Sequence, residues 1–241
     1  MSVLSDRDIF EARKSGEIII DPFVPEHVKG SSYDVRVGHY YYETERNVKG
    51  GIYNPFDQAS VMRYFGSVKE AVTHEQFLDE THLRRLEGIP LDHKIIVIGA
   101  GQRILAHTHE FIGSVPGSDI TTMMKARSST GRNGFSVCHD AGWGDPGYFN
   151  RWTMEIQNIN REHPLPLPVG TRVGQIVFFN TGIVEIPYRS KYQRDSYEGL
   201  PASVALERIK ANWKPDDMLP KTYEDEITAP EVVVGLSGDT Q

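Results

Sequence analysis

Residues 152–158 read WTMEIQN, and this stretch shows most clearly how the chain folds. Apolar side chains at 152, 154 and 156 alternate with Thr153, Glu155 and Gln157, which is the period of a strand with one buried face. Many short runs of this kind, separated by Gly and Pro, predict a mainly β protein with a barrel or sandwich core. We expect further strands at 17–20, 33–37, 94–98, 103–106, 111–114, 136–138, 175–180 and 184–187.

Two segments predict helices. Ser5 followed by Asp8 is typical of a helix N-terminus, and Gly16 is a suitable C-terminal stop, so we expect a short helix between them. Residues 202–213 carry apolar side chains at helical spacing, which predicts a second helix near the end of the chain.

The domain organisation follows from changes in composition. Residues 53–88 are charged and helix-prone, which indicates an insertion in the β structure. From residue 214 onward the chain is rich in Pro, Asp, Glu and Gly. We therefore expect one domain over residues 1–213 that contains the insertion, followed by a C-terminal arm or flexible tail over 214–241.

Composition and charge disfavour several classes of protein. The 241 residues are 39% hydrophobic and 24% charged, which is ordinary for a globular protein. A net charge of −7 disfavours binding to nucleic acid polymers, because the surface would repel their phosphates. The sequence shows neither an apolar run of about 20 residues nor a signal peptide, so we expect no membrane association. With the single cysteine Cys138, these features predict a cytoplasmic protein.

The loop sequence at 127–134 reads RSSTGRNG. Small hydroxyl residues followed by glycine offer closely spaced backbone N–H groups, and Arg127 and Arg132 add guanidinium groups. Such a set is able to cradle phosphates. The alternative is a polar connection with two solvated arginines, which is the commoner outcome for this pattern taken alone.

A second loop, at 138–148, reads CHDAGWGDPGY. Its glycines, its proline and the small Ala141 let the backbone approach a flat ligand closely. Asp145 is suited to accept a hydrogen bond from a sugar hydroxyl, and Tyr148 is suited to pack on the sugar. The alternative is a long hairpin whose aromatic residues cover the end of a barrel.

Glu155 stands in the middle of its strand. A carboxylate in such a place either faces solvent, which is the usual case, or points into a polar cavity. In a cavity, partial burial would raise its pKa toward the range that suits a general base.

These motifs, in this order along one chain, resemble the dCTP deaminase family, which shares its fold with trimeric dUTPases. The resemblance covers most of residues 1–210 apart from the insertion. It implies a distorted, dUTPase-like β-barrel that assembles as a homotrimer, with each active site built from more than one subunit. The matching segments are RSSTGRNG (127–134), AGWGDPGY (141–148), TMEIQN (153–158), LSDRDI (4–9), EIIIDPF (17–23), SSYDVRVG (31–38), PVGTRVGQIVFF (168–179) and KYQ (191–193).

The resemblance also implies roles for individual residues. Glu155 would activate water for attack on the amine-bearing ring carbon, while Ser128 and Arg132 would position water and substrate and stabilise the developing charge. Mg²⁺ would be bound through the nucleotide triphosphate. The implied substrate-binding residues are Arg127, Ser129, Ala141, Asp145, Tyr148, Gln175, Tyr188, Lys191 and Gln193.

Glu155 and the cysteine count separate this chain from two other enzyme classes. Trimeric dUTPases resemble it around Asp145 and Tyr148 but do not place a glutamate at position 155. Zinc deaminases need a C-x-x-C pair as metal ligands, which a chain with one cysteine does not supply, so we expect no zinc.

The sequence therefore predicts hydrolytic deamination of dCTP to dUTP and ammonia, with Glu155 as general base. Three alternatives stay open: a bifunctional deaminase and diphosphatase that gives dUMP and pyrophosphate, a non-catalytic nucleotide-binding module on the same fold, and a plain dUTPase. The non-catalytic module stays open because acids at 195 and 198 follow the KYQ motif, and acidic side chains are poor neighbours for phosphate. We also expect Asp34 and Arg36 to form a structural ion pair that supports the site.

Overall fold

The computed structural model describes residues 2–44, 51–186, 188–193 and 197–227. Its strands are β1 (Ser2–Val3), β2 (Ile18–Asp21), β3 (Val28–Lys29), β4 (Ser32–Glu43), β5 (Lys69–Glu70), β6 (Val72–Thr73), β7 (Lys94–Ile98), β8 (Arg103–Ser114), β9 (Ile120–Ala126), β10 (Phe135–Val137), β11 (Trp143–Gly144), β12 (Phe149–Asn158), β13 (Leu165–Pro168) and β14 (Arg172–Asn180). Its helices are α1 (Asp6–Ser15), α2 (Gln58–Phe65), α3 (His74–Thr81), α4 (Ser128–Arg132) and α5 (Ala202–Asn212), with 3-10 turns η1 (Pro25–His27), η2 (Pro215–Met218) and η3 (Thr222–Glu224).

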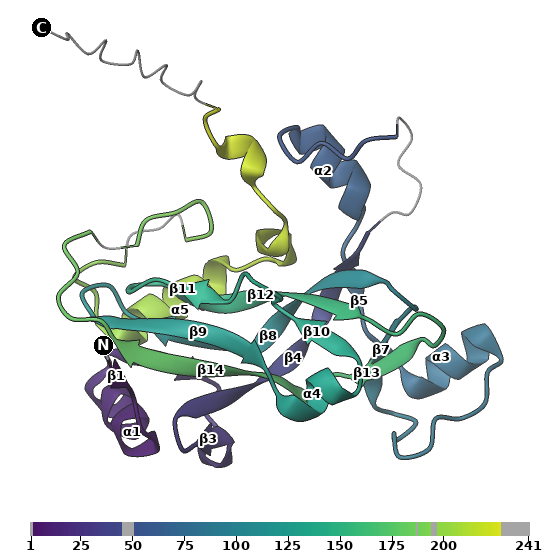
Figure 1. Cartoon of the computed structure of the whole chain (residues 1–241), viewed down its shortest axis with the longest axis horizontal. Helices are drawn as coiled ribbons and strands as arrows, with labels where there is room; N and C mark the ends of the chain where they lie inside the picture. Colours follow the sequence, from purple (N-terminus) through teal and green to yellow (C-terminus); the bar gives the residue numbers. More distant parts are fainter. Residues whose placement is uncertain (1, 45–50, 187, 194–196, 228–241) are drawn as a thin grey trace, which may run out of the picture.

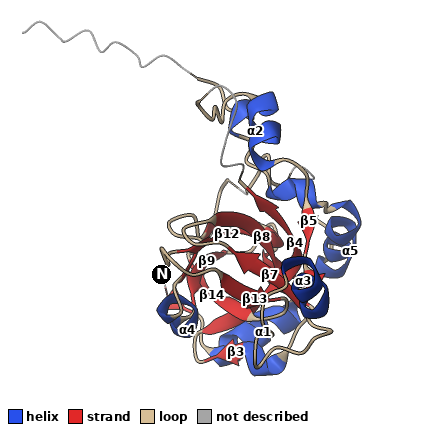
Figure 2. Cartoon of the chain, turned by 90° about the vertical axis from the view of Figure 1, so that its right-hand side faces the viewer, coloured by secondary structure: helices blue, strands red, loops and turns tan. Residues whose placement is uncertain are grey.

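One large sheet forms the body of the molecule. In the described part of the chain it has eleven strands, whose main path runs β10-β12-β8-β4-β14-β9-β11. The sheet curls around an apolar core, as the end-on view shows (Figure 2). The prediction of a mainly β chain that forms a distorted barrel is therefore confirmed.

Strand β8 lies in the middle of this sheet and joins two predicted strands into one. The sequence breaks the apolar pattern at His107-Thr108-His109, which made residues 103–106 and 111–114 look separate. In the structure the Thr108 hydroxyl accepts a hydrogen bond from the backbone N–H of Trp152 at 2.8 Å. This bond lies where the register between β12 and β8 shifts, so the polar residues mark a bulge and not a turn.

The N-terminal helix α1 forms as predicted, because its signals are local. The Ser5 side chain accepts a hydrogen bond from the Asp8 N–H, and the Asp8 carboxylate accepts one from the Ser5 N–H. Gly16 ends the helix in the left-handed conformation, with φ of 84°. The predicted helix near the C-terminus is also present, as α5.

Two predictions are wrong. Residues 184–186 of the strand expected at 184–187 are not a strand, and Pro187 lies outside the described residues. The preceding strand β14 ends at Asn180, where it lies between β1 and β9, and the chain leaves the sheet there.

The second error concerns the pairing of Asp34 with Arg36. Arg36 instead donates from its backbone N–H and its Nε to the buried Glu110 of β8, at 3.0 and 2.6 Å. Asp34 pairs with Arg127 and Arg172. Each side chain therefore meets a charge on a neighbouring strand or loop, which sequence spacing does not reveal.

Helix α2 of the insertion and the C-terminal segment pack together on one side of the main sheet. Figure 1 shows α2 and the C-terminal turns above the sheet, on the side opposite α1. The Tyr42 hydroxyl donates to Asp216 at 2.5 Å and ties the segment to β4. The buried members of this cluster are Tyr42, Val61, Phe65, Leu105, Met218 and Leu219.

Among the described residues, no helix has the length and apolar character needed to cross a membrane.

Candidate active site

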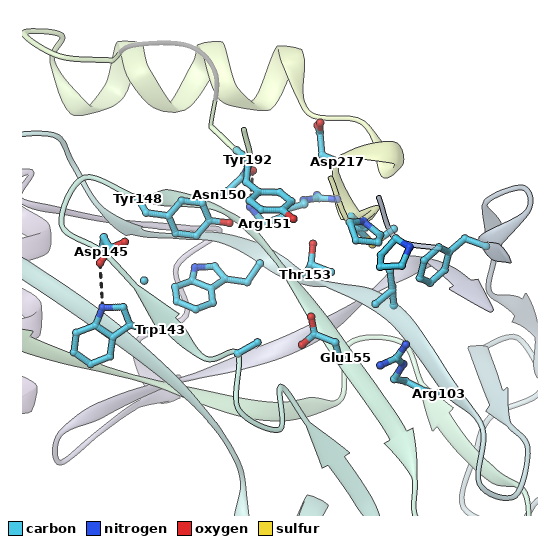
Figure 3. Close-up of a pocket in the computed structure, with 18 of the residues that line it drawn as sticks. Arg103, Trp143, Asp145, Tyr148, Asn150, Arg151, Thr153, Glu155, Tyr192 and Asp217 are labelled. Carbon is cyan, nitrogen blue, oxygen red and sulfur yellow. Dashed lines mark hydrogen bonds between the residues drawn. The ribbon is translucent and has the colours of Figure 1, made fainter. Parts of the chain in front are cut away.

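A cavity of about 510 Å³ lies over strands β12 and β8. Its floor is the face of β12 that carries Thr153 and Glu155 (Figure 3). Tyr53 and Phe65 from the insertion, together with Met218 from the C-terminal segment, form part of its wall. A volume of this size is typical of small-ligand sites.

Glu155 enters the cavity because of the alternation of β12. It pairs with Leu105 of β8, and its side chain points toward the open space (Figure 3). Among the described residues, its Oε2 atom is buried and has no hydrogen-bond partner. Burial raises the pKa of the Glu155 carboxyl above its ordinary value. A desolvated carboxylate with a free oxygen is equipped to take a proton from water.

Asp145 and Tyr148 lie at the other end of the cavity, away from Arg103 (Figure 3). The Trp143 indole N–H donates to Asp145 Oδ1 at 3.1 Å, which orients the carboxylate. The Tyr148 ring packs edge-on against Trp152 and Tyr188, with ring centroids 5.4 and 5.2 Å apart. These contacts hold both side chains in place before any ligand binds.

Two glycines allow the backbone of this loop to pack tightly. A Cβ atom on Gly144 would lie 2.4 Å from Thr122 Oγ1 and 2.5 Å from the Trp152 ring. A Cβ on Gly142 would lie 2.3 Å from the Met124 carbonyl oxygen. Only glycine fits at either position, so the loop that carries Ala141 and Asp145 is pressed directly against β9.

The structure brings together five of the predicted site residues within one chain. They are Glu155, Ala141, Asp145, Tyr148 and Tyr188, and all of them line the same cavity.

The residues of the 127–132 segment lie elsewhere. Arg127 precedes α4, and its Nε is 3.2 Å from Asp34 Oδ2, while its Nη1 donates to the Arg172 carbonyl oxygen at 3.3 Å. Ser128, Ser129 and Arg132 are exposed on α4. None of the four lines the cavity of its own chain.

Three other predicted residues are also outside the cavity. Gln175 is in β14, paired with Lys125 and Asp34. Lys191 forms an ion pair with Asp225 at 2.5 Å. Gln193 is buried, accepts from the Phe149 N–H at 3.0 Å and donates to the Gly147 carbonyl at 2.8 Å.

The geometry of Gln193 gives it a role that the sequence did not suggest. Both ends of its amide are used to hold the turn at 147–149, directly after Asp145 in the chain. Gln193 therefore supports the turn at 147–149 from outside the cavity.

Sequence reasoning missed the cavity residues Arg103, Arg151 and Asp217. Arg151 is half-buried, and its guanidinium lies 4.9 Å from the Phe111 ring centroid and 4.7 Å from that of Trp213. The alternation of β12 places Arg151 near the Glu155 face, which was the one available signal. Arg103 and Asp217 reach the cavity only through strand pairing and tertiary packing.

The curled sheet thus carries a cavity of small-ligand size with a partly buried carboxylate on its floor, an arrangement typical of enzyme sites. The chain belongs to the dCTP deaminase-like family, whose family model matches residues 3–181.

Curated relatives agree with this family. The chain is 32% identical over 198 residues to "dCTP deaminase, dUMP-forming" of Acidothermus cellulolyticus, covering 82% of this chain and 90% of that protein. It is 33% identical over 201 residues to the protein of the same name from Methanosphaera stadtmanae, covering 83% and 90%.

Among solved structures, the chain is similar to a 2'-deoxycytidine 5'-triphosphate deaminase from Agrobacterium tumefaciens, with a TM-score of 0.49 and 17% identity. The match covers 73% of this chain, and it spans about half the length of that one, 48%.

Proposed function

We propose that this protein converts dCTP to dUMP, with release of ammonia and pyrophosphate. The observation that carries the deamination half is the Glu155 carboxylate, which faces the cavity with one buried oxygen that has no hydrogen-bond partner within the described part of the chain. The diphosphatase half is supported by the relatives named dUMP-forming, which favour the bifunctional alternative over simple release of dUTP.

In the proposed deamination, Glu155 takes a proton from a water molecule whose oxygen attacks C4 of the cytosine ring. The same carboxyl then passes this proton to N3 of the ring. The second proton of the water moves from the new C4 hydroxyl to the amine, which leaves as ammonia when the bond between C4 and the exocyclic nitrogen breaks. This half-reaction consumes one water and yields dUTP. General base catalysis of this kind contributes about 10²- to 10⁴-fold to the rate.

The proposed binding mode follows the length of the cavity. The sugar lies by Asp145 and Tyr148, and the base lies by Ala141 with its C4 edge toward Glu155. Tyr188 packs against Tyr148 and closes the sugar end. In the second half-reaction a water attacks the α-phosphorus, which breaks the α–β phosphate bond and leaves dUMP and pyrophosphate.

We propose that a neighbouring copy of the chain in a homotrimer completes each site. Its Arg127 and Ser129 face the phosphates, while its Ser128 and Arg132 position water and substrate. Arg127, Ser128, Ser129 and Arg132 do not line the cavity of their own chain, and three of them are exposed on the short helix α4. Exposed hydroxyl and guanidinium groups on one loop suit the triphosphate of a nucleotide held by an adjacent subunit.

The proposed substrate is the Mg²⁺ complex of dCTP, in which the metal is held by phosphate oxygens. The described residues contain no group of three or more His, Cys, Asp or Glu side chains placed to hold a metal ion. A metal that arrives with the triphosphate does not need one. We propose that zinc takes no part, so a zinc-selective chelator leaves turnover unchanged.

The test measures ammonia, pyrophosphate and the nucleotide product together, with dCTP, dCMP, CTP and dUTP as substrates. The proposal expects dCTP to give ammonia and pyrophosphate in equal amounts with dUMP as product. Ammonia with accumulating dUTP would show a deaminase without diphosphatase activity. Nucleotide binding without ammonia would show a non-catalytic module, and hydrolysis of dUTP alone would show a plain dUTPase.

The shared site has its own test, based on mixed oligomers. Glu155→Gln and Ser128→Ala are each expected to be inactive, because each removes one half of every site. Denaturing and refolding the two together would produce trimers in which some sites carry both wild-type halves. Recovered activity supports a site shared between subunits, whereas a mixture as inactive as its parents contradicts it.

A further inference from the structure

The buried Glu155 carboxyl raises a question that the proposed reaction does not answer. Burial raises its pKa, and a general base must be ionised before it takes a proton. One of its oxygens is buried without a hydrogen-bond partner among the described residues, so hydrogen bonding to that oxygen does not favour the ionised form. A cation close to the cavity floor would do so.

Two arginines line the cavity, Arg103 and Arg151. The Arg151 guanidinium lies over the rings of Phe111 and Trp213, on elements away from Glu155. Burial raises the pKa of Glu155; the residue's own backbone N–H lowers it in part, and the charge of Arg103 lowers it further, by a smaller amount. None of the ion pairs among the described residues includes Arg103, so no other carboxylate takes up its charge.

Strand pairing explains why these two residues are neighbours. Glu155 of β12 pairs with Leu105 of β8, and Gln157 pairs with Arg103. Because side chains alternate, Arg103 and Leu105 share the face of the sheet that carries Glu155. Arg103 is therefore the diagonal neighbour of Glu155, a relationship that places residues roughly 7–8 Å apart and within reach of a long side chain. Figure 3 shows Arg103 next to Glu155 on the cavity floor, with the Glu155 oxygens turned toward the open space.

We propose that Arg103 is a positioning residue that keeps Glu155 ionised and oriented toward the attacking water. The inference rests on the proposed function, because it assigns Arg103 to the deamination step through Glu155. It does not place Arg103 in contact with the substrate. A water molecule held beside the guanidinium would donate to Glu155 while its oxygen faces the substrate.

Other ionisable groups face this part of the cavity and belong in the comparison. Cys138 lies behind Glu155, and burial raises the pKa of its thiol well above its ordinary value, so it stays neutral. Tyr53 also lines the cavity, and burial raises the pKa of its hydroxyl, so it too stays neutral at ordinary pH. The charged groups in the rest of the cavity are Asp145, Arg151 and Asp217. Arg103 is the cation among them that acts on Glu155.

The test is the pH dependence of kcat/KM for ammonia release in the full-length protein and in Arg103→Leu and Arg103→Lys. Arg208→Leu is the matched control, because it removes the same charge from an exposed position on α5. We expect the acid limb of the profile to move to higher pH in Arg103→Leu. If the limb moves by one pH unit, kcat/KM falls about tenfold at low pH and changes little at high pH. Arg103→Lys keeps the charge and is expected to keep the wild-type limb.

Two results would overturn the proposal. One is an equal loss at every pH in Arg103→Leu, which indicates a structural role; the other is an unchanged profile. A direct titration of the Glu155 carboxyl by carbon NMR, in wild type and Arg103→Leu, keeps the inference separate from the proposed function. If the wild type releases no ammonia, the function fails, while a higher Glu155 titration midpoint in Arg103→Leu still supports the coupling.

Discussion

The carboxylate oxygen Oδ2 of Asp34 lies 3.2 Å from Nε of Arg127, the residue that immediately precedes helix α4. The same oxygen is 3.1 Å from Nη1 of Arg172. Asp34 is buried, whereas the two arginines are partly exposed. One buried carboxylate in β4 thus fixes the start of the loop that carries the proposed phosphate-binding residues.

Asp34→Asn is expected to destabilise the protein by about 1–3 kcal/mol. Breaking a buried pair is costly, but the partly exposed arginines recover some hydration. Urea unfolding measures the effect, and Glu26→Gln, at an exposed residue of η1, serves as the control. If the Asp34 variant unfolds at the same urea concentration as the wild type, the ion pairs of Asp34 with Arg127 and Arg172 do not contribute to stability.

Glu155→Gln is expected to lower ammonia release by at least about 10²-fold while the fold is retained. Its stability is expected to depend on pH in a defined direction. Because burial raises the pKa of the folded Glu155 carboxyl, ionising it costs folding free energy as the pH rises through that pKa. The variant lacks this cost.

Thermal unfolding of both proteins at several pH values checks this. Glu155→Gln should be at least as stable as the wild type at about pH 8, and the difference should shrink toward about pH 4, near the ordinary pKa of a glutamate. A variant less stable than the wild type at the higher pH would contradict this expectation. It would mean that the ionised carboxylate has hydrogen-bond partners in the folded protein, although Oε2 has none among the described residues.

Gln193→Ala is expected to cost about 1–3 kcal/mol, because it leaves the Phe149 N–H and the Gly147 carbonyl without their partner. The turn after Asp145 should loosen, so KM for dCTP should rise more than kcat falls. Steady-state kinetics measures the split. A Gln193 variant with unchanged KM would show that the turn holds its shape through its other contacts.

Gly144→Ala tests the close approach of the loop to Trp152. The added Cβ would meet Thr122 and the Trp152 ring at 2.4 and 2.5 Å, and overpacking of this kind costs about 1–3 kcal/mol. Gly30→Ala is the matched control, since its added methyl group would have nothing within 4 Å. Equal melting temperatures for the two variants would contradict the tight packing.

The sequence predicted well what depends on neighbours along the chain. Helix α1 follows from Ser5, Asp8 and Gly16, whose interactions all lie within a few residues. The alternation of residues 152–158 likewise placed Glu155 opposite the apolar face of its strand, and the structure puts that side chain on the cavity floor.

The sequence did not determine the contacts between side chains far apart in the chain. These contacts depend on which distant strands pair, and in which register. The partners of Asp34 and Arg36, and the diagonal placement of Arg103 beside Glu155, arise from pairings between residues far apart in the chain. A shift of one residue in any pairing would turn every side chain to the other face, and no local pattern reports it.

The walls of the cavity were decided in the same way. The insertion and the C-terminal segment carry no motif of their own, yet Phe65 and Met218 meet in one buried cluster and both line the cavity. Local sequence thus determined many of the elements and the chemical group on the cavity floor. Only the tertiary structure decided what surrounds that group, because burial and charge come from side chains that folding brings together from separate parts of the chain.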